Sequence, residues 1–139
     1  MARAKFLADT STFARLSRPT VTVAFAPLVA QGQVAVCAPV MFELGYSARN
    51  LADYRAIMDR LDAFERAPVT DGDHDRAVSV QQHLAASGQH RMLSLVDALV
   101  AAVAESRGLT VLHYDADYEV VAAFTGQRQR WIVDRGTAD

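Results

Sequence analysis

The chain has 139 residues, the usual size of one domain, so we expect a single domain over residues 1–139. Apolar residues make up 51% and charged residues 22% of the chain, which excludes global disorder. The net charge of −2 excludes a broad basic field for nucleic acid, so a polyanion would need a local basic patch.

Short apolar runs and helical patterns alternate along the first half of the chain. Pro39 suits a first helical position, and Asn50 suits a helix cap. Thr10 and Ser11 follow Asp9 as good helix starters. The expected elements are a strand at 5–8, helices at 10–16 and 21–30, a strand at 34–37, helices from 39 and from 51 to 64, and a short strand at 67–69.

The second half of the chain continues this alternation. Thr70 with Asp73 fits a capping box, and Ser94 with Asp97 repeats the pattern. The expected elements are helices at 70–88 and 95–107, a strand at 109–113, a turn and short helix at 115–124, a strand at 131–133 and a loose tail at 134–139. Alternating strands and helices predict an α/β fold, with a mainly parallel sheet of about five strands flanked by helices.

Four acidic residues occupy related places in this pattern. Asp9 and Asp115 lie just beyond apolar strands, and Glu43 and Asp97 lie near the starts of helices. Taken alone, Asp9 and Asp97 could be plain helix caps, and Asp115 could lie in a turn. Glu43, as one glutamate on a helix, indicates nothing by itself. If the strands are parallel, however, their carboxyl ends meet at one edge, and clustered carboxylates repel one another unless a cation is bound. Oxygen ligands without histidine or cysteine suit Mg²⁺ or Mn²⁺.

The order strand–Asp, helix–Glu, capped helix–Asp-Ala and strand–Asp-x-Asp–aromatic resembles the PIN-domain family, and most closely the VapC toxins of bacterial toxin–antitoxin pairs. The motifs are Asp9-Thr10-Ser11, Glu43-Leu44, Asp97-Ala98-Leu99-Val100-Ala101-Ala102 and His113-Tyr114-Asp115-Ala116-Asp117-Tyr118. The resemblance runs from Phe6 to Trp131. It departs from the family at His113, where many relatives have threonine.

The resemblance implies a three-layer PIN-like fold and a Mg²⁺- or Mn²⁺-dependent endoribonuclease toxin that a VapB-like antitoxin neutralises. The catalytic residues would be Asp9, Glu43, Asp97 and Asp115, of which Asp9, Asp97 and Asp115 would bind the metal. Ser11 would orient the Asp9 carboxylate, and Asp117 would be an auxiliary acid beside Asp115. The chemistry fits these residues, because phosphodiester hydrolysis needs an activated water and neutralised phosphoryl oxygens, which divalent cations supply.

The partners would be RNA, the antitoxin and a second copy of the chain. Arg15 and Arg91 are the candidate RNA contacts because their segments adjoin the acidic positions. No aromatic RNA-binding motif is present, so base stacking is not predicted. The apolar faces at 21–30 and 54–64 are candidates for the antitoxin and homodimer contacts. No segment reaches the ~18 apolar residues that span a bilayer, so we expect a cytoplasmic protein without a membrane segment.

Three alternative functions are a non-toxin PIN nuclease, a PIN fold that serves only as a binding scaffold, and a signalling receiver. A non-toxin PIN nuclease would carry the same acids, whereas a binding scaffold would lack some of them, and all four are present here. A non-catalytic signalling receiver would need a lysine after its last strand and adjacent acids after its first, but Lys5 is the only lysine and Thr10 follows Asp9. The acids at 71–75 resemble part of a calcium loop, but Arg76 replaces its glycine, so they indicate a helix start. Cys37 lies in an apolar run and is expected to be a buried, inert thiol.

Overall fold

Five parallel strands form one sheet in the part of the chain that the computed structural model describes, residues 4–139. They are β1 (Phe6–Ala8), β2 (Val34–Val36), β3 (Glu65–Arg66), β4 (Thr110–His113) and β5 (Gln129–Trp131), in the spatial order β3-β2-β1-β4-β5. The chain builds the sheet outward from β1 to β3 and then crosses to the other side for β4 and β5. The predicted parallel α/β fold is therefore confirmed, and the carboxyl ends of β1 and β4 lie side by side, where such sheets place ligands.

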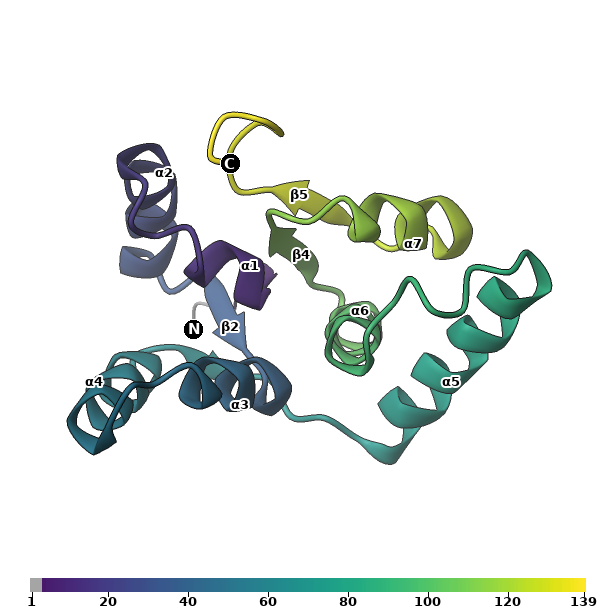
Figure 1. The fold of residues 1–139 in the computed structure, drawn as a ribbon, viewed down its shortest axis with the longest axis horizontal. Coiled ribbons are helices and arrows are strands. Elements are labelled where there is room, and N and C mark those ends of the chain that lie inside the picture. The colour runs from purple at the N-terminus through teal and green to yellow at the C-terminus, as the bar shows by residue number, and fades with distance from the viewer. Residues whose placement is uncertain (1–3) are drawn as a thin grey trace.

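Seven helices connect these strands within the described residues. They are α1 (Thr10–Phe13), α2 (Pro19–Ala30), α3 (Ala38–Tyr46), α4 (Leu51–Leu61), α5 (Asp71–Ala86), α6 (Leu95–Arg107) and α7 (Asp117–Thr125). Figure 1 shows α5 beside α6 and α3 beside α4, and both pairs are in contact. No helix between residues 4 and 139 is long and apolar enough to cross a membrane.

The strands bury side chains on both faces, with the alternation that a pleated strand requires. Leu7 and Val111 point into a core formed with α3, α5, α6 and α7. Ala8 and Leu112, one residue later on each strand, belong to a second core packed against α2 through Phe25. Each fully buried leucine or valine contributes about 1.5–3 kcal/mol. The two cores hold β1 and β4, and hence their carboxyl ends, in fixed positions.

The two predicted helix caps are present. The Thr70 hydroxyl accepts from the backbone N–H of Asp73, whose carboxylate accepts from the Thr70 N–H in return. The Ser94 hydroxyl accepts from the N–H of Asp97 at the start of α6. The acids at 71–75 therefore begin α5, as predicted, and do not form a calcium loop.

Two strand positions differ from the prediction. The strand predicted at 67–69 is β3, Glu65–Arg66, because Ala67 makes the last pairing bond, from its N–H to the carbonyl of Val36, and Pro68 has no N–H to continue the ladder. The strand predicted at 131–133 is β5, Gln129–Trp131, an edge strand whose polar residues conceal its pattern.

The prediction of a loose tail at 134–139 is also wrong. Ala138 is only 3% exposed and belongs to the second core. The Tyr114 hydroxyl accepts from the N–H groups of Gly136 at 2.8 Å and Ala138 at 3.0 Å, and it donates to Asp139 at 2.7 Å. One buried tyrosine thus fastens the tail to the end of β4.

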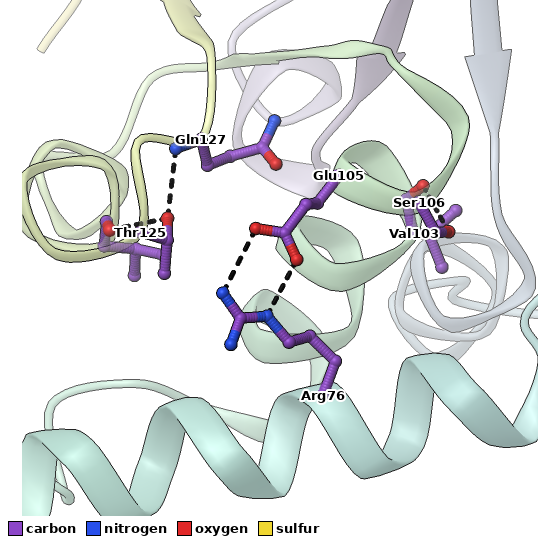
Figure 2. A network of polar contacts seen from close by, with 7 residues as sticks. Arg76, Val103, Glu105, Ser106, Thr125 and Gln127 are labelled. Atoms are coloured by element: carbon purple, nitrogen blue, oxygen red, sulfur yellow. Dashed lines mark hydrogen bonds and ion pairs between the residues drawn. The ribbon is translucent and has the colours of Figure 1, made fainter.

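An ion pair between Arg76 of α5 and Glu105 of α6 joins these two helices (Figure 2). Arg76 donates from Nε to Oε1 of Glu105 at 2.7 Å and from Nη2 to Oε2 at 3.2 Å. Both side chains are about one-third exposed, so the pair contributes at most about 1 kcal/mol. Nearby, the N–H of Gln127 donates to the Thr125 hydroxyl and closes α7 before β5.

Candidate active site

Asp9 lies at the carboxyl end of β1, where it caps α1, and it is only 2% exposed. Its Oδ2 accepts from the N–H of Ser11 at 3.0 Å and from the Ser11 hydroxyl at 2.6 Å. Its Oδ1 accepts from the hydroxyl of Tyr118 at 2.7 Å. A carboxylate has about four lone-pair positions, so three are occupied and one remains, on Oδ1. The Asp9 carboxylate is therefore fixed in orientation but still able to bind one more group.

Tyr118, on α7, links Asp9 to the next acid. It is 1% exposed, and its hydroxyl lies 3.2 Å from Oδ1 of Asp97 as well as 2.7 Å from Asp9. Burial, followed by the negative charges of Asp9 and Asp97, raises the pKa of the Tyr118 hydroxyl well above its usual value. The hydroxyl therefore stays protonated and acts as a donor between the two acids. The sequence motif includes this residue only as an aromatic, so its role at the site was missed.

A group of three carboxylates lies beside this link. Asp97 comes from the first turn of α6, Asp115 from the turn after β4, and Asp117 from the start of α7. One oxygen of each lies within 4.8 Å of the others. The N–H of Asp117 also donates to Oδ1 of Asp115 at 2.9 Å, which holds the turn together. Three carboxylates at this spacing offer an all-oxygen ligand set for a hard divalent cation.

The charges of these residues oppose one another. Burial, together with the charges of Asp9 and Asp115, raises the pKa of Asp97 to about 7. Burial and the charge of Asp115 also raise the pKa of Asp117. A protonated Asp97 can donate to the Tyr118 oxygen, which the single proton of that hydroxyl leaves free to accept. Repulsion among these carboxylates therefore lowers the stability of the metal-free protein, and a bound cation would remove that repulsion.

His113, the last residue of β4, holds the backbone of Asp115. Its ring is fully buried, Nδ1 accepts from the N–H of Asp115 at 3.0 Å, and Nε2 lies 2.6 Å from Oε1 of Gln129. These two partners assign the neutral form with the proton on Nε2. Burial also lowers the pKa of the ring, which favours that form. His113 therefore orients the Asp115 turn without adding charge to the site.

Glu43 lies at the rim of the site. The Thr10 hydroxyl donates to Oε1 of Glu43 at 2.5 Å, which ties α3 to the residue after Asp9. Among the described residues, Glu43 is outside the group formed by Asp97, Asp115 and Asp117. The structure therefore brings Asp9, Asp97, Asp115 and Asp117 to one edge of the sheet and places Glu43 beside them.

The two candidate RNA contacts have different surroundings. The guanidinium carbon of Arg15 lies 4.6 Å from the centre of the Tyr114 ring, in a cavity that Asp115 also lines. Arg91 is exposed in the connection between α5 and α6. Only Arg15 is thus placed on a surface shared with the acids.

An apolar groove of about 460 Å³ has Glu43 among its lining residues. Its walls include Phe25 of α2, Leu44 of α3, and Ile57 and Phe64 on and after α4. Thr10 and Glu43 line it too, so it leads to the acidic site. The apolar faces predicted at 21–30 and 54–64 therefore meet in one groove.

Cys37 offers no alternative nucleophile. It is buried, and burial raises the pKa of its thiol to about 11. Since the thiolate is the reactive form, this thiol is inert at neutral pH.

Comparison with known proteins places this geometry in a family. The family model described as PIN domain matches residues 6–123. Ribonuclease VapC51 of Mycobacterium tuberculosis is 47% identical over 135 residues, covering 97% of this chain and 98% of the relative. Ribonuclease VapC18 of the same species is 41% identical over 134 residues, covering 95% and 98%.

Solved structures show the same fold. A DNA-bound VapBC from Salmonella typhimurium matches with a TM-score of 0.77 at 20% identity, over 94% of this chain and 99% of that one. VapBC2 from Rickettsia felis, bound to a promoter DNA fragment, matches with a TM-score of 0.75 at 13% identity, over 91% and 97%. With a matching family model over most of its length and close relatives over nearly all of it, the chain belongs to the PIN-domain family.

Proposed function

We propose that this protein is a divalent-metal-dependent endoribonuclease, the toxin of a VapBC-type pair. The observation that carries the proposal is the meeting of Asp97, Asp115 and Asp117 within 4.8 Å, with Asp9 joined to Asp97 through Tyr118. Relatives named as VapC ribonucleases match nearly the whole chain, which supports the same activity here. A cytoplasmic location is part of this proposal, because the proposed RNA substrate is in the cytoplasm.

The acidic residues fit Mg²⁺ or Mn²⁺. Asp97, Asp115 and Asp117 would hold the ion, and Asp9, joined to Asp97 through Tyr118, could supply a further oxygen. All donors are oxygens, as hard cations prefer. When bound, the ion would neutralise charge on the phosphoryl oxygens and lower the pKa of a water molecule.

The protein's own groups would prepare this chemistry. Asp97 must lose its proton to act as a ligand, so the affinity for the cation should rise as pH passes about 7. Ser11 and Tyr118 hold Asp9, and His113 holds the Asp115 turn, so the carboxylates keep their orientation. We assign Glu43 to orienting the attacking water, since Thr10 fixes its carboxylate through one oxygen and leaves the other free to accept.

The apolar groove is the proposed site for a VapB-like antitoxin. Several solved structures with this fold are VapBC complexes, which supports such a partner. A helix or extended segment seated against Phe25, Ile57 and Phe64 would end near Glu43, where a basic side chain could pair with it. Phe42 and Tyr46, one turn apart and exposed on α3, would then serve homodimer formation.

An RNA cleavage assay tests the proposed activity. Single-stranded RNA is incubated with wild type or Asp97→Asn in Mg²⁺, Mn²⁺ or a chelator, and Asp59→Asn, an exposed acid on α4, is the matched control. Wild type and Asp59→Asn should cleave only with the metal, and Asp97→Asn should lose at least about 100-fold. Equal cleavage by all three proteins, or cleavage in the chelator, would contradict the proposal. A non-toxin nuclease would cleave in the same way but would not bind an antitoxin.

A further inference from the structure

A second cavity, of about 500 Å³, opens beside Asp115 and shares no lining residue with the apolar groove. We call it the Trp131 cavity. Its walls include Arg15, Tyr114, Asp115, Trp131 and Arg135. One metal-site carboxylate therefore borders this cavity, so a molecule that fills it would lie next to the proposed cleavage site.

The cavity presents two guanidinium groups that no strong ion pair occupies. Arg15 stacks over the Tyr114 ring, with its guanidinium carbon 4.6 Å from the ring centre. Arg135 is 67% exposed and reaches Glu119, itself 46% exposed, only at 3.6 Å. Stacking over a ring leaves the in-plane N–H groups of an arginine available, and these match a phosphate. Asp139 also lines the cavity and keeps its negative charge, and its Oδ1 is held by the Tyr114 hydroxyl.

The same cavity holds an aromatic ring in a fixed orientation. His113 and Tyr114 pack against Trp131 at ring-centre distances of 5.0 and 5.2 Å, the Tyr114 ring at 88° to it. Arg135 lies over the ring with its guanidinium carbon 5.7 Å from the centre. A surface that accepts a planar guanidinium also accepts a nucleic acid base by stacking.

We propose that the Trp131 cavity binds one nucleotide of single-stranded RNA next to the cleaved bond. Its base would stack on Trp131 in the place that the Arg135 guanidinium now holds, and its phosphates would be bound by Arg15 and by Arg135 after Arg135 moves off the ring. This inference rests on the proposed ribonuclease function and extends it to substrate recognition. Stacking requires an unpaired base, so the cavity selects single strands, loops or ends over duplex RNA. The negative Asp115 also lines the cavity, but it belongs to the carboxylate group with Asp97 and Asp117, and a cation bound there would offset its repulsion of phosphate.

The intrinsic fluorescence of Trp131 tests this directly, because the chain has a single tryptophan. The Asp97→Asn variant, which should not cleave, is titrated with oligo(A), oligo(U), the duplex that they form, and inorganic phosphate, in Mg²⁺. Both single strands should quench the fluorescence saturably, and the duplex and phosphate should not. Arg15→Gln, placed in the same Asp97→Asn protein, should weaken binding about tenfold. Arg128→Gln, at the opposite end of the sheet where Arg128 binds the Gly108 carbonyl, should not.

Kinetics separate this inference from the activity itself. In otherwise wild-type protein, Trp131→Leu should raise KM at least about fivefold with a smaller effect on kcat, and Trp131→Phe should restore most of the loss. If wild type cleaves RNA and labelled RNA binds, yet Trp131 fluorescence does not change, the cavity assignment is wrong and the ribonuclease proposal stands. If single strands quench Trp131 but wild type cleaves nothing, the binding site stands and the ribonuclease proposal fails. Quenching by duplex equal to that by single strands would also overturn the assignment.

Discussion

Replacing Asp97 by asparagine should make the metal-free protein more stable at pH 8 while destroying its activity. The pKa of Asp97 rises from 3.8 to about 7 on folding, because of burial and the charges of Asp9 and Asp115. Below about pH 4, both the folded and the unfolded protein hold this proton. Between pH 4 and 7, only the folded protein holds it, so the free energy of unfolding falls as pH rises. Above pH 7 that loss is complete.

The size of the loss follows from the shift in pKa. About three units correspond to about 4 kcal/mol as an upper limit. The Asp97 side chain is only half-buried, so solvent screening reduces the figure to about 2 kcal/mol. Asparagine has nearly the same shape and carries no charge. The difference in unfolding free energy, Asp97→Asn minus wild type, should therefore increase by about 2 kcal/mol between pH 4 and pH 8.

Urea unfolding in a chelator, at several pH values from 4 to 8, measures this difference. Asp59→Asn is the control and should show no such increase. Adding Mg²⁺ at about 100 times the wild-type Kd should then stabilise wild type by about 2.7 kcal/mol, and Asp97→Asn, with at least about tenfold weaker affinity, by at most about 1.4 kcal/mol. A difference that is flat with pH, or that favours wild type more at pH 8 than at pH 4, would refute the view that the carboxylates destabilise one another.

Three further predictions concern other parts of the molecule. Tyr118→Phe removes the hydroxyl that donates to Asp9 but keeps the ring. Mn²⁺ affinity and RNA cleavage should therefore fall about 10- to 100-fold, while the melting temperature measured by CD changes little. Unchanged Mn²⁺ affinity would argue against a role for Tyr118 in holding Asp9. Ile57→Glu places a charge in the apolar groove, so co-purification with the cognate antitoxin should be lost while RNA cleavage persists. Retained co-purification would show that the antitoxin binds at another surface. Arg76→Ala breaks an exposed ion pair with Glu105 and should lower the urea-unfolding free energy by at most about 1 kcal/mol, and a larger loss would show that the pair is more than a surface contact.

The convergence of the acids could be predicted from the sequence because it depends on topology. Asp9 and Asp115 follow strands that proved to be parallel neighbours, so their carboxyl ends had to meet. Asp97 was expected in a helix start with Ser94, and that cap is present. These inferences needed only local patterns and the direction of the strands.

The contacts that complete the site could not be predicted in this way. Tyr118 reaches Asp9 across 109 positions of the chain, and no periodicity records such a contact. Asp117 was expected only in an auxiliary role, but its position on the first turn of α7 brings one of its oxygens within 4.8 Å of those of Asp97 and Asp115. His113 was noted as a departure from the family, and only its ring partners reveal what it does.

Edge strands and the tail escaped prediction for a related reason. The two residues of β3 are both charged and exposed, so no apolar run marks them. The polar residues of β5 similarly shifted the predicted strand toward the apolar residues that follow. The tail is ordered by one distant hydroxyl, that of Tyr114, which sequence composition does not reveal.

The central claim is that Asp97 and Asp115, brought together by the sheet, bind one divalent cation between them. Calorimetric titration of the metal-free protein with Mn²⁺ at pH 8 tests it without reference to any RNA. Wild type and Asp59→Asn should bind Mn²⁺ with the same affinity, and Asp97→Asn and Asp115→Asn should each lose at least about tenfold. Mn²⁺ binding of equal strength in all four proteins would contradict the account.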